Sequence, residues 1–154
     1  GRKHILLIIR EIINFEPDNK ATNIDCALHF MTEAIKKKCA AFLISDFIDD
    51  GDYSKSMTIA NRKHDLTAIQ VYDKRDSKMP DVGLIRVVDS ETGKEMWIDT
   101  SSKRVRQLYD KAWYERQQRL YSITAKSGVD IASVATDEDY VKSLLGLFKK
   151  RSIH

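Results

Sequence analysis

The chain has 154 residues, 42% of them hydrophobic and 32% charged, which suits one domain with a sizeable core and is too apolar for a disordered segment. Its 26 Lys and Arg residues against 23 Asp and Glu residues give a net charge of +3, well short of the dense basic patches that dominate nucleic-acid binding. No apolar run has the roughly 18 to 20 residues of a membrane span and no signal-peptide pattern is present, so we expect a single cytoplasmic domain over residues 1–154.

Two helices are expected first. The first is indicated by apolar residues at helical spacing, with charged residues facing away: Ile5, Leu6, Ile8, Ile9, Ile12 and Ile13. Pro17 ends this helix, because proline disfavours helical backbone in the residue before it. A second helix is expected over about residues 23–38, with Ile24 and Leu28 on its buried face and lysines 36–38 complementing the dipole at its C-terminal end.

A buried strand over residues 41–46 follows and ends abruptly on Asp46. In open α/β sheets, ligands bind just beyond the carboxyl ends of the parallel strands, so Asp46 is a candidate ligand. The alternative is that Asp46 only caps the turn after the strand. The spacing of the residues leaves both interpretations open.

A helix over about residues 53–63 and a strand over 66–72 complete a βαβ unit, which requires parallel pairing and a right-handed crossover. Residues 74–80 form a polar connector. The segments 84–88 and 95–98 flank a Gly-containing turn at 89–94 and predict a small β-hairpin.

The last part of the chain predicts a helix over about residues 102–127, which Gly128 ends, then a strand over 129–134. The final helix, about 139–151, is expected to start at a capping box from Thr136 to Asp139. Its predicted buried residues are Tyr140, Val141, Leu144, Leu145 and Phe148. The alternating pattern predicts an α/β fold, a Rossmann-like three-layer parallel sheet with helices on both faces and the hairpin at one edge.

The usual enzyme signatures are absent: no Gly-rich phosphate loop, G-x-S-x-G elbow or H-E-x-x-H motif occurs. We therefore predict no catalytic residues. Hydroxyl and carboxylate oxygens are the ligands that Mg²⁺ prefers, so Thr22 and Asp46 are candidate metal ligands. The acidic residues Asp49, Asp50 and Asp52 are expected to form a solvated turn.

Several segments together resemble a bacterial domain-of-unknown-function family, DUF58, whose C-terminal part is similar to a von Willebrand factor type A domain. The resemblance covers essentially the whole chain in order. The segments that carry it are Gly1-Arg2-Lys3-His4-Ile5-Leu6, Ala21-Thr22-Asn23-Ile24-Asp25, Phe42-Leu43-Ile44-Ser45-Asp46-Phe47, Arg62-Lys63-His64-Asp65, Pro80-Asp81-Val82-Gly83-Leu84, Asp89-Ser90-Glu91-Thr92-Gly93, Trp97-Ile98-Asp99-Thr100 and Thr136-Asp137-Glu138-Asp139-Tyr140.

Type A domains carry a metal-ion-dependent adhesion site made by three loops: D-x-S-x-S after the first strand, a Thr before a helix, and an Asp after the fourth strand. The resemblance implies that Thr22 is the second element and Asp46 the third. A literal D-x-S-x-S occurs at residues 52–56, but it lies after the Asp46 strand, where Asp52 is better interpreted as a helix N-cap.

The chain therefore resembles the C-terminal portion of the family, with the N-terminal strands of the domain missing. Two expectations follow. Magnesium belongs to the full-length parent and binds this chain weakly or not at all. The exposed edge of strand 41–46 is expected to find a partner through homodimerisation, domain swapping or a rearranged sheet.

Three functions remain open. The first is a non-enzymatic protein-interaction module with an incomplete metal site, whose partner class by resemblance is a MoxR-type AAA+ ATPase, in assembly or chaperone-like work. The second is a metal-dependent hydrolase that uses Asp46 with Asp49 or Asp50. The third is a structural piece without a site.

Overall fold

The structure is a computed structural model that describes residues 1–17, 21–89 and 93–151. The helices are α1 (Arg2–Asn14), α2 (Ile24–Ala34), α3 (Ser54–Lys63), α4 (Lys74–Ser77), α5 (Lys103–Ser127) and α6 (Tyr140–Arg151). The strands are β1 (Ala40–Ser45), β2 (Asp65–Tyr72), β3 (Leu84–Val88), β4 (Glu95–Asp99) and β5 (Asp130–Ala135).

The centre of the fold is a parallel sheet of three strands in the order β1-β2-β5. Ala40 of β1 pairs with Asp65 of β2, and Thr67 of β2 pairs with Asp130 of β5, so the three strands start at one edge and end at the other. The predicted βαβ unit and the parallel pairing are therefore confirmed. Because ligands of α/β folds bind at the carboxyl ends of the parallel strands, we expect a functional site at the edge where β1, β2 and β5 end.

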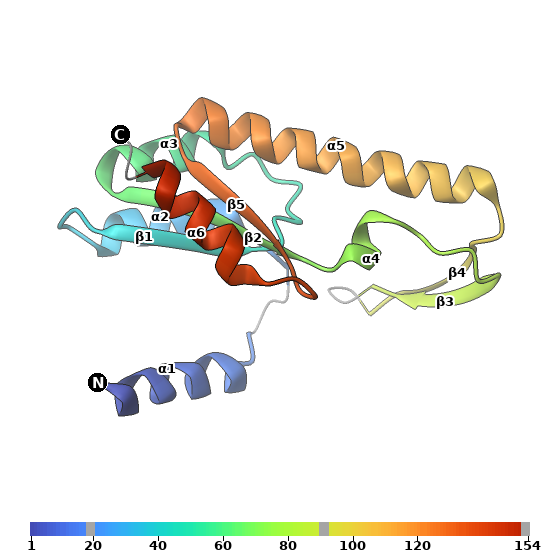
Figure 1. Cartoon of the computed structure of the whole chain (residues 1–154), viewed down its shortest axis with the longest axis horizontal. Helices are drawn as coiled ribbons and strands as arrows, with labels where there is room; N and C mark the ends of the chain where they lie inside the picture. Colours follow the sequence, from blue (N-terminus) through green and yellow to red (C-terminus); the bar gives the residue numbers. More distant parts are fainter. Residues whose placement is uncertain (18–20, 90–92, 152–154) are drawn as a thin grey trace.

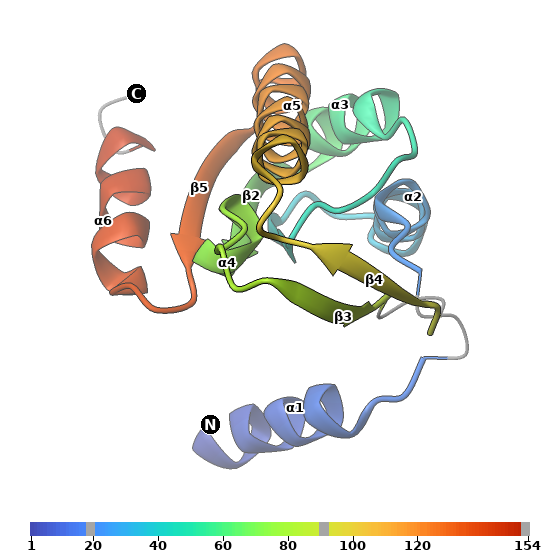
Figure 2. The ribbon, with the colours of Figure 1, turned by 90° about the vertical axis from the view of Figure 1, so that its right-hand side faces the viewer.

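Helices cover both faces of this sheet, as expected (Figures 1 and 2). On one face α2 packs beside α3, and α3 packs on α5. On the other face α6 packs on β5, and its Arg151 pairs with Asp130 at 3.3 Å and with Asp65. The three-layer α/β architecture predicted from the sequence is confirmed.

The main core lies between the sheet and the α2–α3–α5 face. Its buried residues come from these helices, from the sheet and from the turn after β1: Ile24, Leu28, Phe47, Tyr53, Met57, Ala60, Leu66, Ala68, Leu120, Ile123 and Val129. The turn after β1 thus contributes two aromatic side chains to the core, Phe47 and Tyr53, and this fixes its position.

The predicted hairpin forms as the antiparallel pair β3–β4, and residues 90–92 of its expected turn lie outside the described residues. Its expected place at one edge of the parallel sheet is wrong, because β3 and β4 form a separate two-stranded sheet. Figure 1 shows the hairpin below the N-terminal half of α5, at a distance from the parallel sheet. None of the described helices is both long enough and apolar enough to cross a membrane.

The structure corrects several expectations. α2 ends at Ala34 rather than residue 38, because Ile35 is already extended where the chain turns toward β1. α1 forms as predicted, but it lies apart from the sheet and buries none of its side chains (Figures 1 and 2). In α6 the buried side chain is Leu147, whereas four of the predicted core residues are exposed: Tyr140, Val141, Leu145 and Phe148.

Candidate functional site

The candidate site lies where the first two parallel strands end. β1 ends at Ser45 and β2 ends at Tyr72, and the turns that follow them share one edge of the sheet. Asp46 follows β1 directly and is exposed. The structure therefore places this predicted ligand at the edge where α/β folds bind ligands.

The side chain of Asp46 makes its hydrogen bonds within its own turn. Its Oδ1 accepts from the backbone N–H of Ile48 at 3.1 Å and from the hydroxyl of Ser45 at 3.4 Å. This is an Asx-type turn. Asp46 therefore caps the turn after the strand, which is one of the two interpretations that the sequence allowed. No hydrogen bond from the described residues reaches Oδ2, so one carboxylate oxygen stays available to a ligand.

Phe47 gives the turn after β1 its unusual backbone. Its φ is +58°, a left-handed conformation that non-glycine residues rarely adopt, and its backbone N–H donates to the Ser45 hydroxyl at 3.0 Å. The ring is buried and lies 6.5 Å from that of Tyr53, between ring centroids. Burial of the ring offsets the strain and fixes Asp46 at the surface.

Thr22 lies just before α2, and the Asp46 turn reaches the start of this helix. The link is made by Asp49, whose Oδ2 accepts from the backbone N–H of Ile24 at 2.8 Å. The side chain of Asn23 caps the same helix by accepting from the N–H of Cys26 at 2.8 Å. The loops that carry Thr22 and Asp46 therefore meet at the N-terminus of α2.

The acidic turn was expected from the sequence to be solvated, but residues 49–51 instead join the turn after β1 to α2 and α5. Asp49 Oδ1 accepts from the backbone N–H of Gly51 at 2.7 Å, so both of its oxygens are engaged. Arg119 of α5 donates to the backbone carbonyls of residues 49, 50 and 51. The guanidinium thereby holds the turn against α5.

The literal D-x-S-x-S at residues 52–56 lies at the start of α3, but the prediction that Asp52 is the N-cap is wrong, because the N-cap of α3 is Tyr53, one residue later. Asp52 Oδ1 accepts from the backbone N–H of Ser54 at 3.1 Å and from its hydroxyl at 2.7 Å. These bonds lower the pKa of Asp52 below its usual value. Ser56 is buried and donates to Asp25, which lies in α2.

Sequence reasoning missed a polar network that crosses the three strands. Gln70 of β2 is 1% exposed; its Oε1 accepts from the Ser133 hydroxyl of β5 at 2.9 Å, and its Nε2 lies 3.5 Å from the carbonyl of Asp46. Tyr121 of α5 bonds to Ser133 at 3.1 Å. The signal that could have found it is a Gln inside the apolar strand 66–72, since a buried amide requires partners.

The oxygen donors of Thr22 and Asp46 are of the types that suit a hard cation. Thr22 and Asp46 offer hydroxyl and carboxylate oxygens, the ligands that Mg²⁺ prefers. Within the part of the chain that the structure describes, no group of three or more His, Cys, Asp or Glu residues is placed to hold a metal ion.

Comparison with known protein families gives one match over most of the chain. The model of the family described as "Protein of unknown function DUF58" matches residues 1–119.

Curated relatives come from mycobacteria. An uncharacterized protein of Mycobacterium avium is 27% identical over 118 residues, which cover 75% of this chain and 68% of that protein. An uncharacterized protein of Mycobacterium tuberculosis is 24% identical over 155 residues, which cover 98% of this chain and 48% of that protein. The chain therefore spans about half the length of the M. tuberculosis relative.

Among solved structures, the crystal structure of the conserved hypothetical protein BatB from Bacteroides thetaiotaomicron is similar. Its TM-score is 0.48 at 14% sequence identity, and the match covers 90% of this chain and 63% of BatB.

Proposed function

Because the chain belongs to the DUF58 family of proteins of unknown function, we propose that it is a non-enzymatic protein-interaction module with a von Willebrand factor A-like fold. Its metal-ion-dependent adhesion site takes Thr22 and Asp46 from this chain and is incomplete within residues 1–154. The hydrogen bond from Ile24 to Asp49 carries this proposal, since it brings the Asp46 turn to the helix that Thr22 precedes.

The cation is Mg²⁺, and this chain contributes the Thr22 hydroxyl and the Asp46 carboxylate as ligands. Two protein ligands bind such an ion weakly. In this proposal a D-x-S-x-S loop from outside residues 1–154 supplies the missing ligands, and an acidic side chain of the partner completes them. Binding of the partner would then depend on the metal.

The partner class is a MoxR-type AAA+ ATPase in the cytoplasm, and the work is assembly or chaperone-like. This part of the proposal rests on the family resemblance of the segments around Thr22 and Asp46. The exposed position of Asp46 supports it, because a partner carboxylate can reach an ion only at an open edge.

The alternative is a metal-dependent hydrolase that uses Asp46 with Asp49 or Asp50. The hydrogen bonds of Asp49 favour the module over the enzyme: its two carboxylate oxygens accept from the backbone N–H groups of Ile24 and Gly51. A carboxylate engaged in this way supports the turn and is poorly available to a metal or a water nucleophile.

The test is a binding assay between a MoxR-type ATPase from the same genome and the longest gene product that contains residues 1–154. We expect binding in the presence of Mg²⁺, loss of binding with EDTA, and loss with Asp46→Ala or Thr22→Ala. Asp50→Ala is the matched control and should bind normally, because Asp50 is exposed in the same turn. Mg²⁺-dependent hydrolysis by the purified protein would support the enzyme instead.

A second measurement concerns the isolated chain. Calorimetric titration of residues 1–154 with Mg²⁺ should give little heat, because the site lacks most of its ligands. A dissociation constant of about 1 μM would contradict the incomplete site.

A further inference from the structure

Three polar residues lie directly opposite one another where the parallel strands end. Ser45 of β1 pairs with Gln70 of β2, and Gln70 pairs with Ser133 of β5, so the three side chains share one face of the sheet. Tyr121 of α5 reaches the same face and bonds to Ser133 at 3.1 Å. We call Ser45, Gln70, Ser133 and Tyr121 the polar row. Its β1 end adjoins Asp46, the candidate metal ligand.

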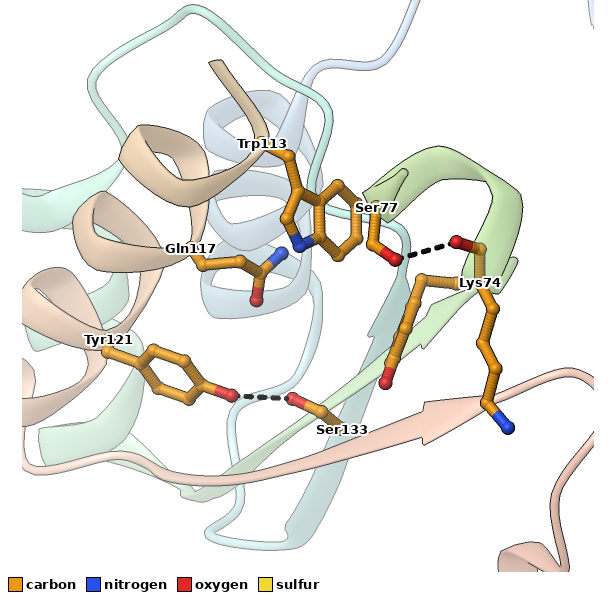
Figure 3. Close-up of a pocket in the computed structure, with 7 residues that line it drawn as sticks. Lys74, Ser77, Trp113, Gln117, Tyr121 and Ser133 are labelled. Atoms are coloured by element: carbon orange, nitrogen blue, oxygen red, sulfur yellow. Dashed lines mark hydrogen bonds between the residues drawn. The ribbon is translucent and has the colours of Figure 1, made fainter. Parts of the chain in front are cut away.

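The direction of the hydrogen bonds along the polar row is fixed. Nε2 of Gln70 lies 3.5 Å from the carbonyl oxygen of Asp46, and a carbonyl can only accept, so the amide turns its NH₂ group toward Asp46 and its oxygen toward Ser133. Ser133 then donates to Oε1 of Gln70 at 2.9 Å. Because the Ser133 hydroxyl has one hydrogen, Tyr121 must donate to Ser133 (Figure 3). Each donor from α5 onward therefore points toward Asp46.

The amide of Gln70 is expensive to bury unless it holds something. Gln70 is 1% exposed, so bulk water does not reach it, and an apolar side chain would fill the same place in the strand without needing partners. Among the described residues, the acceptor that Nε2 reaches is the carbonyl of Asp46. This amide therefore fits a role in holding the turn after β1 better than a role in packing.

Ser45 and Gln70 hold Asp46 at two places. The hydroxyl of Ser45 donates to Oδ1 of Asp46 at 3.4 Å and accepts from the N–H of Phe47 at 3.0 Å. Gln70 holds the backbone carbonyl of Asp46. The polar row thus contacts both the carboxylate and the backbone of this residue. Metal ligands need such support, because the partners behind a ligand set its orientation.

We propose that Gln70 is a positioning residue for Asp46. It holds the carbonyl of Asp46 so that the carboxylate keeps its direction at the sheet edge, while Ser133 and Tyr121 hold the amide of Gln70 in the required orientation. This inference rests on the proposed function, in which Asp46 is a metal ligand. Because Gln70 is buried, it acts without touching the ion or the partner.

The first test measures amide hydrogen exchange by NMR in the intact chain. The N–H groups of Phe47 and Ile48 report on the turn, since they donate to the Ser45 hydroxyl and to Oδ1 of Asp46. Gln70→Met fills a similar volume without hydrogen bonds. We expect both N–H groups to exchange about fivefold faster or more, relative to the N–H groups of β2.

A milder variant tests the other end of the polar row. Tyr121 is 42% exposed and lines an open groove of about 470 Å³, so Tyr121→Phe removes one hydroxyl and leaves the core in place (Figure 3). It should speed exchange at residues 47 and 48 about twofold. This variant decides the test if Gln70→Met does not fold. Tyr114→Phe is its control and should have no effect, because Tyr114 is 62% exposed on α5 and lies outside the row.

Thr124→Val is the matched control for Gln70→Met. Thr124 is also 1% exposed and also forms hydrogen bonds, but these go to the carbonyls of Leu120 and Tyr121 within α5. A general loss of stability speeds exchange in β2 as much as in the turn. The exchange at residues 47 and 48 relative to β2 should therefore stay unchanged in this control.

The second test is the Mg²⁺-dependent binding assay of the proposed function. Gln70→Met should weaken partner binding about fivefold or more, whereas Thr124→Val should bind as the parent does. If the parent itself does not bind, the proposed function fails, and the exchange measurement still decides whether Gln70 holds the turn.

Two results would overturn the inference. If Gln70→Met speeds exchange at residues 47 and 48 no more than in β2, Gln70 contributes only to overall stability. If Gln70→Met binds the partner as tightly as a binding parent does, Asp46 keeps its position without this amide.

Discussion

Asp49 and Ile24 are 25 residues apart in the chain, yet the carboxylate of Asp49 accepts a hydrogen bond from the backbone N–H of Ile24 at 2.8 Å. The bond satisfies one of the free N–H groups at the start of α2 and places a negative charge at the positive end of the helix dipole. The turn after β1 and the start of α2 therefore stabilise each other.

The first prediction concerns this bond. Asp49→Ala should lower the free energy of unfolding by about 1–2 kcal/mol, because it removes a helix cap and leaves a partly buried N–H without its partner. Urea unfolding followed by circular dichroism measures the change. Asp50→Ala should stay within about 0.5 kcal/mol of the parent. Equal effects of the two substitutions would show that the bond to Ile24 contributes nothing.

The second prediction concerns the left-handed backbone of Phe47. Phe47→Ala and Phe47→Gly should both destabilise the protein by roughly 3 kcal/mol, since each loses the buried ring. The glycine variant should nevertheless be about 1 kcal/mol more stable than the alanine variant, because only glycine adopts a φ of +58° without strain. Urea unfolding of the two variants checks this order. At positions with ordinary backbone angles the order is the opposite, and the alanine variant is the more stable one.

The third prediction is a pH dependence at the start of α4. Hydrogen bonds from the guanidinium of Arg75, and then from its backbone N–H, lower the pKa of Asp73 from 3.8 to about 2. Since the folded state favours the ionised form, this contribution to stability is present above about pH 4 and is lost as the pH falls toward 2.

NMR titration of the Asp73 carboxyl should give a midpoint near the lowered pKa of about 2, and Arg75→Ala should move it back toward 3.8. Asp73→Asn keeps the cap but cannot ionise, so it should reduce the loss of stability between pH 4 and pH 2. A midpoint near 3.8 in the parent would contradict the contact with Arg75.

The fourth prediction concerns the outer edge of β1. β2 is the strand partner of β1 in the described chain, and the other edge of β1 pairs with no described strand, while Phe42 and Ile44 are 48% and 64% exposed. We expect sedimentation velocity to show a dimer. Ile44→Lys should shift it toward monomer, because a charge on an edge strand opposes pairing. Leu108→Lys is the control, because Leu108 is exposed on α5 and does not belong to the edge strand. A parent protein that stays monomeric at high concentration would contradict edge pairing.

Much of the fold could be predicted because the strands and their connecting helices have clear local patterns, although the strand over residues 41–46 was expected to be buried and β1 has no buried residue. The strand ending at Asp46 and the βαβ unit after it are examples. The position of α4 could also have been found, since Asp73 and Asp76 form a capping box there. At the start of α6, the sequence favoured Thr136 as the cap, whereas Asp139 accepts from the N–H of Val141.

The site could be predicted only in part, because its key contacts join distant residues. The spacing around Asp46 indicates a turn or a ligand, but nothing local shows that Asp49 reaches Ile24. The same limit applies to burial: α6 has apolar residues on more than one side, and only the position of β5 decides that Leu147 faces inward. Likewise, the pattern of α1 predicts a helix without showing what covers it.

The length of α5 has a mechanical consequence. Its 25 residues span about 37 Å, roughly twice the length of β5, and its N-terminal half extends past the sheet toward the hairpin (Figure 1). The C-terminal half of α5 is anchored in the core by Leu120 and Ile123, so a tilt of the helix about these residues would move its N-terminal end. The distance along α5 from Leu120 to Lys103 is about 25 Å, so a tilt of about 5° at Leu120 would displace the hairpin end of the helix by about 2.2 Å.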